Sequence, residues 1–360
     1  MTEEPREKRI RSKRTKWILI VIIAVLVLLI GAVAAAWFVY DHFYSKSNYV
    51  PDPTEIEISS EVLESLQAEE PTIDPYEESR ILAELESIRE EQQALASMDE
   101  EMRRLQSEAE ETEAPVEDEV VHLLLVGVDR RTATWNGNSD TMVMLSINRT
   151  DMTMTLTSLM RDTAANIPGV GVRKLNNAFA VGGAPLLLQT IQTNFQIPVT
   201  DYAWIDFDGM VKVVDILGGV DLFLTVAEAK VVGIDIPAPQ VVHLDGQKAV
   251  THARDRSSGG YDYMRTQRQR NVLLAIANKA KSGSLGDLAK VAEQILPYIT
   301  HNLDRIRLLT YVNDMINISK YTMQEQRIPY DGLYRSVNQN LVPNYDETAK
   351  RFRAFVYGEQ

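Results

Sequence analysis

The sequence has 360 residues, of which 45% are hydrophobic and 24% charged, a balance typical of folded proteins, and its length favours about two domains. It contains no cysteine, which excludes disulfides, thiolate nucleophiles and cysteine-bound zinc. The net charge of −14 is uneven, because residues 1–50 carry +4, residues 51–120 carry −20 and residues 121–360 carry +2. The chain lacks the broad basic field of nucleic-acid-binding proteins, so nucleic acid is not an expected partner.

Residues 17–40, WILIVIIAVLVLLIGAVAAAWFVY, form an uncharged run that is long enough to cross a bilayer, for which about 20 residues suffice. Trp17 lies at one end of the run and Trp37 and Tyr40 at the other, as interfacial anchors do. Seven basic residues precede the run, so the positive-inside rule predicts a single-pass protein of the cell membrane, with residues 1–16 as a cytoplasmic tail and the rest outside. A cleaved signal peptide is the alternative, but its apolar region is usually only about 7–15 residues long.

Residues 41–120 have the composition of an acidic linker, with a helix expected at about 76–111, where proline and glycine are absent. Apolar residues occupy alternating a and d positions of one heptad register within this helix. They are Ile81, Leu85, Ile88, Leu95 and Met102. Because Gln92 and Asp99 interrupt the register, we interpret the helix as a solvated stalk, with a weak coiled-coil dimer as the alternative.

Residues 121–358 read as a folded α/β domain. Strands are expected at 121–128, 141–148 and 152–159, with a hairpin turn at 148–151, and further strand-like segments lie near 202–207, 220–224 and 326–329. Helical patterns cover 176–195, 208–217, 263–281, 285–296 and 304–318. This mixture predicts one central sheet covered by helices.

Charged residues follow or open the first predicted strands. Asp129 ends the first strand and Asp140 opens the second, so the two carboxylates lie at the same end of the sheet if the strands are neighbours. Two such carboxylates suit Mg²⁺, which usually takes one or two protein carboxylates together with substrate phosphates. The alternative is that each aspartate forms a turn or pairs with an adjacent arginine.

A second cluster of charged residues lies in 254–270. Arg254 and Arg256 would point the same way from an extended segment, and Arg265 and Gln269 would share one face of a helix. A guanidinium group can bind two phosphate oxygens at once through parallel hydrogen bonds. Arginines near the two aspartates therefore predict a site for a diphosphate and a metal ion. A solvated basic surface is the alternative.

The sequence contains neither G-x-S-x-G nor a P-loop nor H-E-x-x-H, which leaves serine hydrolases, P-loop enzymes and zinc proteases without support.

Long strings of this sequence resemble the LytR-CpsA-Psr family of bacterial cell-wall proteins over residues 121–358. The strings include LLLVGVDRR (123–131), SDTMVMLSIN (139–148), SLMRDT (158–163), IPGVGVRKLNNAFAVGG (167–183), DYAWIDFDGMVKVVDILGGVDL (201–222) and LDGQKAVTHARDRSSGGYDYMRTQRQR (244–270). The resemblance implies an α/β/α sandwich with a long apolar pocket. It also implies a phosphotransferase that moves a teichoic acid, capsular polysaccharide or related glycopolymer from a polyprenyl-pyrophosphate carrier onto peptidoglycan.

The resemblance also assigns roles to individual residues. Asp129 and Asp140 would bind Mg²⁺, for which Mn²⁺ could substitute. The diphosphate would be held by Arg130, Arg161, Lys174, Arg254, Arg256, Arg265 and Gln269. Asp162 and Asp262 would orient the arginines, or an acidic residue would act as base, and which one does so stays open. The implied catalytic set is Asp129, Arg130, Arg161, Asp162, Arg256, Asp262 and Arg265.

Three positions depart from the usual pattern of this family: Met160, Met264 and His252 stand where it commonly has proline, glycine and tyrosine. None of them removes a charged residue of the expected site. Two other functions stay open at this point, a polyprenyl-pyrophosphate hydrolase that uses water as acceptor and a non-enzymatic regulator of the cell envelope.

Overall fold

The computed structural model describes residues 40–68, 73–107, 120–130, 135–259, 261–281 and 285–358. The chain divides into two compact units, residues 1–47 and residues 48–360, and the sheet and its helices belong to the second. The membrane span expected at 17–40 lies outside the described residues apart from Tyr40. Among the residues that are described, no helix is long and apolar enough to span a bilayer.

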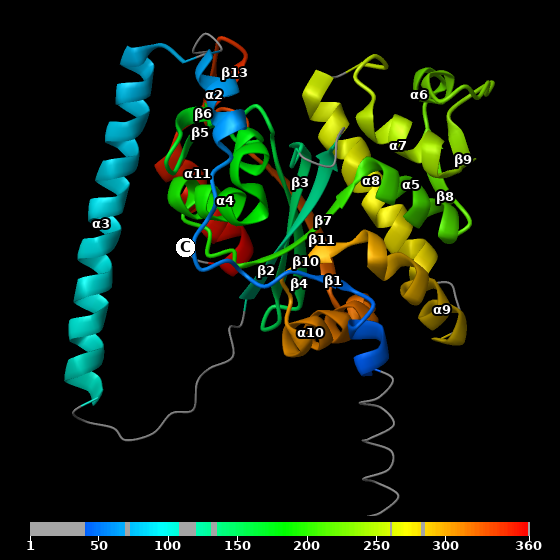
Figure 1. Cartoon of the computed structure of the whole chain (residues 1–360), viewed down its shortest axis with the longest axis horizontal. Coiled ribbons are helices and arrows are strands. Elements are labelled where there is room, and N and C mark those ends of the chain that lie inside the picture. The colour runs from blue at the N-terminus through cyan, green and yellow to red at the C-terminus, as the bar shows by residue number, and fades with distance from the viewer. Residues whose placement is uncertain are drawn as a thin grey trace, which may run out of the picture. The chain divides into compact units, whose positions relative to one another are not determined.

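A mixed sheet of seven strands forms the centre of the second unit, in the order β1-β10-β7-β2-β3-β4-β11 (Figure 1). The strands are β1 (Asn48–Tyr49), β2 (Val120–Asp129), β3 (Asn138–Asn148), β4 (Thr153–Leu159), β7 (Asp201–Asp206), β10 (Thr300–His301) and β11 (Thr322–Ile328). Strands β2, β3 and β4 are antiparallel neighbours, whereas β7 runs parallel to β2 and β11 parallel to β4. The Asn148 side chain accepts a hydrogen bond from the Asp151 amide at 2.9 Å, which closes the hairpin turn expected there.

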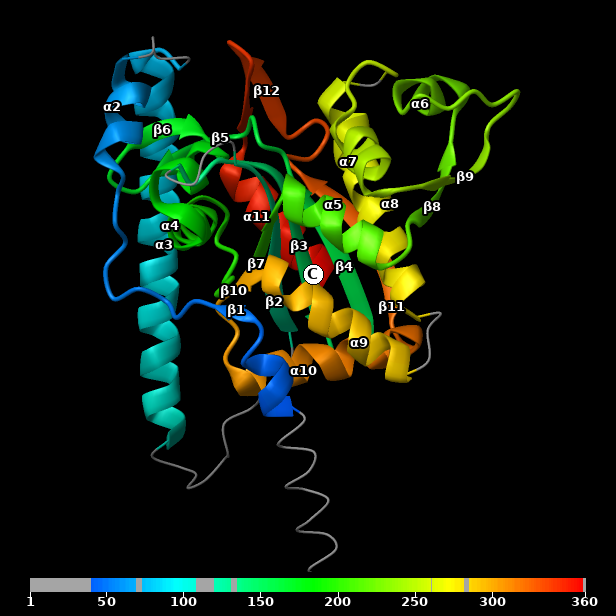
Figure 2. The same cartoon turned by 45° about the vertical axis from the view of Figure 1, so that its right-hand side comes forward.

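Helices cover both faces of this sheet (Figures 1 and 2). Along β2 and β3 alternate side chains enter different cores, so that Leu124 and Met144 pack with one set of helices and Leu123 and Leu145 with the other. The first set comprises α3 (Pro75–Ser107), α4 (Asn177–Phe195) and α11 (Tyr345–Tyr357), and α8 (Tyr261–Lys281) and α10 (Arg305–Ile316) belong to the second. The α/β class and the central covered sheet expected from the sequence are therefore confirmed.

Smaller elements complete the unit around this sandwich. The remaining helices are α2 (Ser60–Ala68), α5 (Phe207–Ile216), α6 (Val226–Val231), α7 (Gly246–Arg254), α9 (Leu285–Ile295), η1 (Leu296–Tyr298) and η2 (Ile318–Lys320). Three two-stranded sheets pair β5 (Ala164–Ile167) with β6 (Gly171–Lys174), β8 (Val220–Leu224) with β9 (Gln240–Leu244), and β12 (Tyr334–Val337) with β13 (Asn340–Pro343). A third core lies beneath the hairpin β8–β9 and involves α5, α7 and α8.

The segment expected to be a linker contributes to this unit. Strand β1 pairs with β10 at the edge of the sheet, and helix α3 confirms the helix expected at 76–111. Ile81, Leu85 and Ile88 of that helix are at most 8% exposed and pack into the core with α4 and α11. The interpretation of this part of the helix as a solvated or dimerising stalk is therefore wrong, because its apolar residues are buried within the same chain.

Candidate active site

Asp129 and Asp140 lie at the same end of the sheet, as expected, because β2 and β3 are antiparallel neighbours. The pairing register aligns Gly127 with Thr141 and Val128 with Ser139, which leaves Asp140 as the extra residue of a β-bulge. A bulge changes the direction of the strand locally and often redirects a side chain beside a functional site. The side chains of Asp129 and Asp140 are 17% and 20% exposed, so both carboxylates are accessible at this edge.

Arg161 links the carboxylate of Asp140 to the segment that follows β4. Its Nη1 donates to Oδ1 of Asp140 at 2.9 Å, and its Nε donates to Oδ2 of Asp162 at 3.4 Å. The other oxygen of Asp162 accepts a hydrogen bond from Nζ of Lys174 at 2.8 Å. Lys174 is the last residue of β6 and pairs with Ala164 of β5, so the small hairpin holds this amine beside the end of β4. The result is a row of alternating charges, Asp140, Arg161, Asp162 and Lys174.

Arg254 reaches the other carboxylate from the last turn of α7, where the helix dipole favours a cation. Its Nη2 lies 3.6 Å from Oδ2 of Asp129, and its guanidinium carbon lies 4.4 Å from the centroid of the Phe207 ring. The ring is placed by Asp206, whose side chain accepts a hydrogen bond from the amide of Gly209 at 2.7 Å and begins α5. Arg254 is thus held by a charge on one side and by an aromatic face on the other.

The turn after α7 presents two arginines outward and one aspartate inward. Arg254 and Arg256 are exposed, whereas Asp255 between them is buried and accepts a hydrogen bond from the Ser257 amide at 2.7 Å. Burial alone would raise the pKa of Asp255, but hydrogen bonds from Ser258 and Ser257 and the charge of Arg268 hold that pKa below its usual value. The buried carboxylate therefore stays ionised and fixes the turn that carries both arginines.

Helix α8 brings Gln269 to the same place. Its Nε2 donates to the backbone oxygen of Asp140 at 3.3 Å, and Arg265, one turn earlier, is only 3% exposed. Two further arginines of this helix form structural ion pairs, because Arg268 Nε lies 2.8 Å from Glu228 and Arg270 Nε lies 2.8 Å from Glu325. The alternative of a solvated basic surface is wrong for this helix, since these three arginines are all buried.

The hydrogen bonds and ion pairs given above involve seven of the eleven residues expected in the site, five of them in one network and Asp129 with Arg254 as a separate pair at the end of the neighbouring strand. The seven are Asp129, Asp140, Arg161, Asp162, Lys174, Arg254 and Gln269. Arg130, Arg256 and Arg265 are each within four residues of a member of this set, and Nε of Arg130 donates to the backbone oxygen of Trp135 at 3.1 Å. Asp262 lies in the first turn of α8, and its side chain falls outside what the structure describes.

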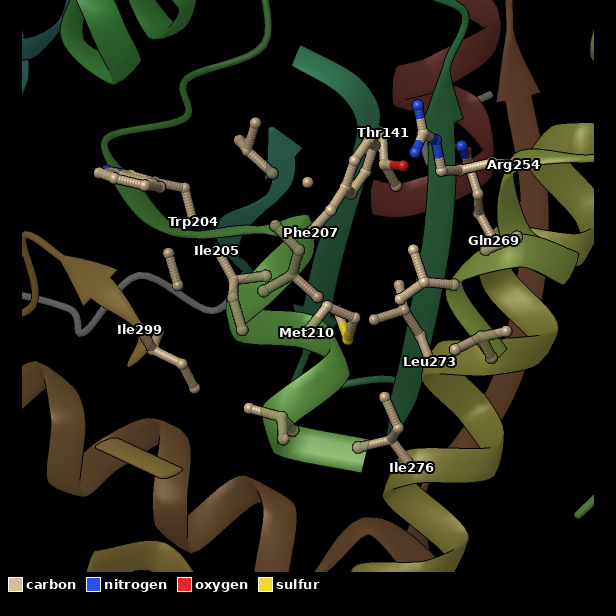
Figure 3. Close-up of a pocket in the computed structure, with 18 residues that line it drawn as sticks. Thr141, Trp204, Ile205, Phe207, Met210, Arg254, Gln269, Leu273, Ile276 and Ile299 are labelled. Atoms are coloured by element: carbon tan, nitrogen blue, oxygen red, sulfur yellow. The ribbon is translucent and has the colours of Figure 1, made fainter. Parts of the chain in front are cut away.

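An apolar pocket opens beside these charges and extends between the sheet and helices α5, α7 and α8. Its empty volume is about 1000 Å³, the open mouth included. Figure 3 places Thr141, Arg254 and Gln269 together at one end of the pocket, whereas Leu273, Ile276 and Ile299 lie toward the other. Arg254 and Gln269 therefore belong both to the charged cluster and to the pocket wall. An apolar pocket is what the resemblance led us to expect in this domain.

A second pocket, with an empty volume of about 660 Å³ including its mouth, shares Trp204 with the first and is lined by Arg130. Val50, Pro51 and Pro53 form part of its wall, so the segment after β1 takes part in it. Sequence reasoning assigned no role to Trp204 or Phe207. Their signal was weak, because both aromatic residues lie in the run DYAWIDFDG, which reads equally well as a buried strand and the start of a helix.

Asp129 and Asp140 are the residues at this edge that could hold a hard divalent cation. Within the described ranges, no group of three or more histidines, aspartates or glutamates could enclose a metal ion. Two carboxylates on neighbouring strands, Asp129 and Asp140, would leave most of the coordination shell to water and phosphate oxygens, which is how Mg²⁺ is usually bound. The nearby arginines and Lys174 would bind the remaining phosphate charge.

Comparison with known families identifies the group of proteins to which this arrangement belongs. The model of the LytR_cpsA_psr family matches residues 87–353, nearly three-quarters of the sequence. The chain belongs to the LytR-CpsA-Psr family. This agrees with the resemblance seen in the strings around Asp129, Arg161 and Arg254, and it extends the matched region to the second half of α3.

Two relatives illustrate the range of names in the LytR-CpsA-Psr family. A protein of Oceanobacillus iheyensis named polyisoprenyl-teichoic acid–peptidoglycan teichoic acid transferase TagU is 33% identical over 209 residues, which cover 55% of this chain and 63% of that protein. Biofilm regulatory protein A of Streptococcus mutans is 28% identical over 234 residues, covering 58% of each chain. The chain thus spans about three-fifths of the length of these curated relatives.

A solved structure of the family supports the fold. It is described as LytR-CPS2A-psr family protein YwtF (TagT) with bound octaprenyl pyrophosphate lipid, and it is 22% identical to this chain. The match covers 69% of this chain and 95% of that one, with a TM-score of 0.50. At this level of identity the comparison establishes a shared fold for the sheet and its covering helices.

Proposed function

We propose that this protein is a membrane-anchored phosphotransferase that moves a glycopolymer from polyprenyl pyrophosphate onto peptidoglycan. The observation that carries the proposal is the double position of Arg254, which lies 3.6 Å from the Asp129 carboxylate and also lines the apolar pocket. A ligand that has a long apolar tail joined to a diphosphate would meet matching surfaces on both sides of this residue. The relatives' names and the lipid-bound structure of TagT support this reading.

In the proposed complex the polyprenyl tail occupies the apolar pocket and the diphosphate lies among Arg161, Lys174 and Arg254. Burial of the tail supplies binding energy at a distance from the reacting bond, so it can hold the diphosphate in place. The second pocket, which is lined by Arg130 and shares Trp204 with the first, would receive the sugars attached to the diphosphate. Arg256 and Arg265 would complete the basic lining.

The reaction transfers the sugar-bearing phosphoryl group to a hydroxyl group. The oxygen of the acceptor hydroxyl forms a bond to the phosphorus next to the sugar, and the bond from that phosphorus to the bridging oxygen breaks. Polyprenyl phosphate leaves with the electron pair, and the hydroxyl proton passes to a base, for which Asp162 or Asp262 is proposed. The arginines neutralise the charge that develops on the phosphoryl oxygens. Mg²⁺ or Mn²⁺, held by Asp129 and Asp140, would supply Lewis-acid stabilisation of the same oxygens.

The proposed location follows from the apolar run 17–40 and the basic residues before it. The N-terminus would lie in the cytoplasm and residues after about 41 outside the cell, where both lipid-linked polymers and the cell wall are found. An anchor of this kind keeps the enzyme in the bilayer that contains its donor, so encounters between enzyme and donor are restricted to a surface.

The test uses the full chain with a polyprenyl-pyrophosphate-linked glycan, MgCl₂ and purified peptidoglycan. We expect the glycan to become covalently attached to peptidoglycan, with release of polyprenyl phosphate that depends on the acceptor. Release at the same rate without peptidoglycan would identify a hydrolase, and no release under either condition would contradict the proposal.

Donors of different tail length provide an internal check on the role of the pocket. Replacing Ile276, at the apolar end of the pocket, by tryptophan should raise the KM for a long-tailed donor and leave a short-tailed donor unaffected. The Asn278→Trp variant, at an exposed position of the same helix, is the matched control and should behave as the wild type.

A further inference from the structure

Helix α10 turns a largely apolar face to solvent. Ile306 is 77% exposed, Leu309 45% and Val312 44%, and these residues follow each other at a spacing of three along the helix. Thr310, Asn313 and Met315 are also exposed on this side and carry no charge, whereas the partly buried Arg305 lies one turn before Leu309. A helix of a soluble protein normally places charged or polar residues on its outer side, so this face calls for a partner.

The side of the same helix that faces the sheet packs Leu308 and Tyr311 into the core and is also attached by polar contacts. Nη1 of Arg307 lies 2.7 Å from Oδ1 of Asp201, and the Tyr311 hydroxyl donates to Oδ2 of Asp201 at 2.9 Å. Asp314, one turn later, lies 2.9 Å from Nη2 of Arg149. Because these contacts fix the rotation of α10, the apolar residues cannot turn inward, and their exposure is a stable property of the fold.

The position of α10 along the sheet is also defined by these contacts. The Tyr311 hydroxyl donates to the backbone oxygen of His122, near the start of β2, whereas Asp129 ends that strand. The helix therefore lies at the end of the sheet opposite to the charged cluster. Figures 1 and 2 both show α10 near one end of the central strands and α7, which carries Arg254, toward the other. His122 and Asp129 are seven positions apart, which corresponds to about 24 Å along a strand.

The length of the connecting chain limits how far this end of the sheet can lie from the expected membrane span. Only the seven residues 41–47 separate Tyr40 from Asn48, and the eight peptide steps between those two residues extend at most about 28 Å. Asn48 is the first residue of β1, which pairs with β10, and α10 begins four residues after His301 of that strand. Tyr49 and Tyr298, on either side of this junction, are 38% and 41% exposed, and tyrosine is enriched at membrane interfaces.

From the exposed apolar face and the short connection we infer that α10 is a second membrane contact, with Ile306, Leu309 and Val312 inserted into the outer surface of the bilayer that holds the anchor. This inference rests on the membrane attachment proposed above, but not on the reaction. It assigns α10 to the interfacial amphipathic helices, which lie in the plane of the bilayer with their apolar face buried.

The orientation has a consequence for the proposed donor. With α10 on the bilayer and the strands upright on it, the charged cluster would stand about 24 Å from α10, so the diphosphate would leave the headgroup region to reach Arg161. The apolar pocket extends away from the cluster toward Ile299, six residues before α10, and would cover the tail over part of this distance. The pocket would then act as an apolar path between the bilayer and the site.

The absence of cysteine allows a direct test in the full chain. A single cysteine at position 312 (V312C) is spin-labelled, and the protein is inserted into nanodiscs of phosphatidylglycerol and phosphatidylethanolamine. Accessibility to oxygen and to a water-soluble nickel chelate is measured by power saturation. Val226 is the matched control, because it is also a valine with 44% exposure and lies in α6, far from α10 in both views. The V226C label reports the same chemistry away from the bilayer.

We expect the label at 312 to be several-fold less accessible to the nickel chelate than the label at 226, and more accessible to oxygen. A second labelled variant, L309C, should give the same result, which covers the case that one substitution perturbs the helix. Equal nickel accessibility at 312 and 226 would overturn the inference. Low accessibility of the label at 312 to the nickel chelate in detergent, together with dipolar broadening between labels on two copies, would overturn the inference as well. That result would identify the face as a dimer interface. Failure of the protein to enter nanodiscs would instead contradict the anchor, whereas a water-exposed α10 leaves the proposed transferase reaction intact.

Discussion

The guanidinium carbon of Arg254 lies 4.4 Å from the centroid of the Phe207 ring, at the boundary between the charged cluster and the apolar pocket. The aromatic face fixes the position of a cation that is otherwise half exposed, with 49% of its side chain accessible. A residue in this position can direct a diphosphate toward Asp129 while an apolar tail continues past it. The contact therefore couples the two parts of the proposed donor site.

Removal of the ring should weaken donor binding more than catalysis. In Phe207→Leu the pocket stays apolar but the cation–π contact, worth about 0.5–1 kcal/mol, is lost, so we expect KM to rise about two- to fivefold with little change in kcat. Steady-state kinetics with varied donor concentration measure this. Met210→Leu, another change in the pocket wall, is the control and should leave KM within twofold. A loss confined to kcat would argue against a role of the ring in binding.

Arg161 should be essential for turnover, because it connects Asp140 with Asp162 and is proposed to face the diphosphate. Loss of one such stabilising group typically lowers the rate by about 10²–10³-fold, and we expect Arg161→Ala to fall in this range. The measurement is kcat/KM for acceptor-dependent transfer. Arg173→Ala is a matched control. Arg173 precedes Lys174 in the chain, and its Nη1 donates to the backbone oxygen of Val172 at 3.0 Å. Equal effects of the two substitutions would place the site elsewhere.

The sequence could predict which residues end the strands but only part of their surroundings. Asp129 and Asp140 could be placed at one sheet end because β2 and β3 are consecutive and antiparallel, and SLMRDT put Arg161 and Asp162 after the third strand. The bulge at Asp140 has no sequence signal of its own, because it depends on the pairing register. The contact of Arg254 with Phe207 could not be predicted either, because these two residues lie 47 positions apart in the chain and on different helices.

The arginines of residues 254–270 show why a charge cluster alone does not define a site. Arg256 and Arg268 are twelve positions apart in one basic stretch, yet the first is exposed and the second is 2% exposed in an ion pair with Glu228. The difference lies in the partner, which is a residue of α6 that only the tertiary fold brings near. The heptad pattern around Ile81 presents the same problem, because an apolar stripe indicates a buried face without saying what covers it.

The burial of helix α3 predicts that this segment contributes to the stability of the domain. Ile81 is 1% exposed, and truncation of such a residue typically costs about 2–4 kcal/mol, so Ile81→Ala should lower the free energy of unfolding by that amount. Leu82, the next residue, is 39% exposed, and Leu82→Ala should cost less than about 1 kcal/mol. Urea unfolding followed by tryptophan fluorescence compares the two. If α3 were a separate stalk, neither substitution would change the unfolding of the sheet domain.

His122 predicts a loss of stability at acidic pH. His122 is 5% exposed. Its Nδ1 lies 2.9 Å from the Ser146 hydroxyl and its Nε2 lies 2.7 Å from the Tyr357 hydroxyl. Burial lowers the pKa of this ring from 6.5 to about 4. The unfolded chain therefore binds a proton between pH 6.5 and 4 that the folded chain does not bind, so folding loses stability as the pH falls through this window. A shift of this size corresponds to about 3 kcal/mol.

The His122→Gln variant, which keeps hydrogen-bonding groups near Ser146 and Tyr357, should remove this part of the pH dependence. Urea unfolding at intervals between pH 8 and pH 4.5 would show a shallower decline for the variant, with the difference accumulating only below about pH 6.5. Burial also lowers the pKa values of His252 and His301, so both proteins should retain a residual slope of the same sign. Above pH 7 the two stability curves should run parallel, which serves as the control. Parallel curves throughout the acidic range would mean that His122 carries the same charge in the folded and unfolded chains, contrary to its buried position on β2.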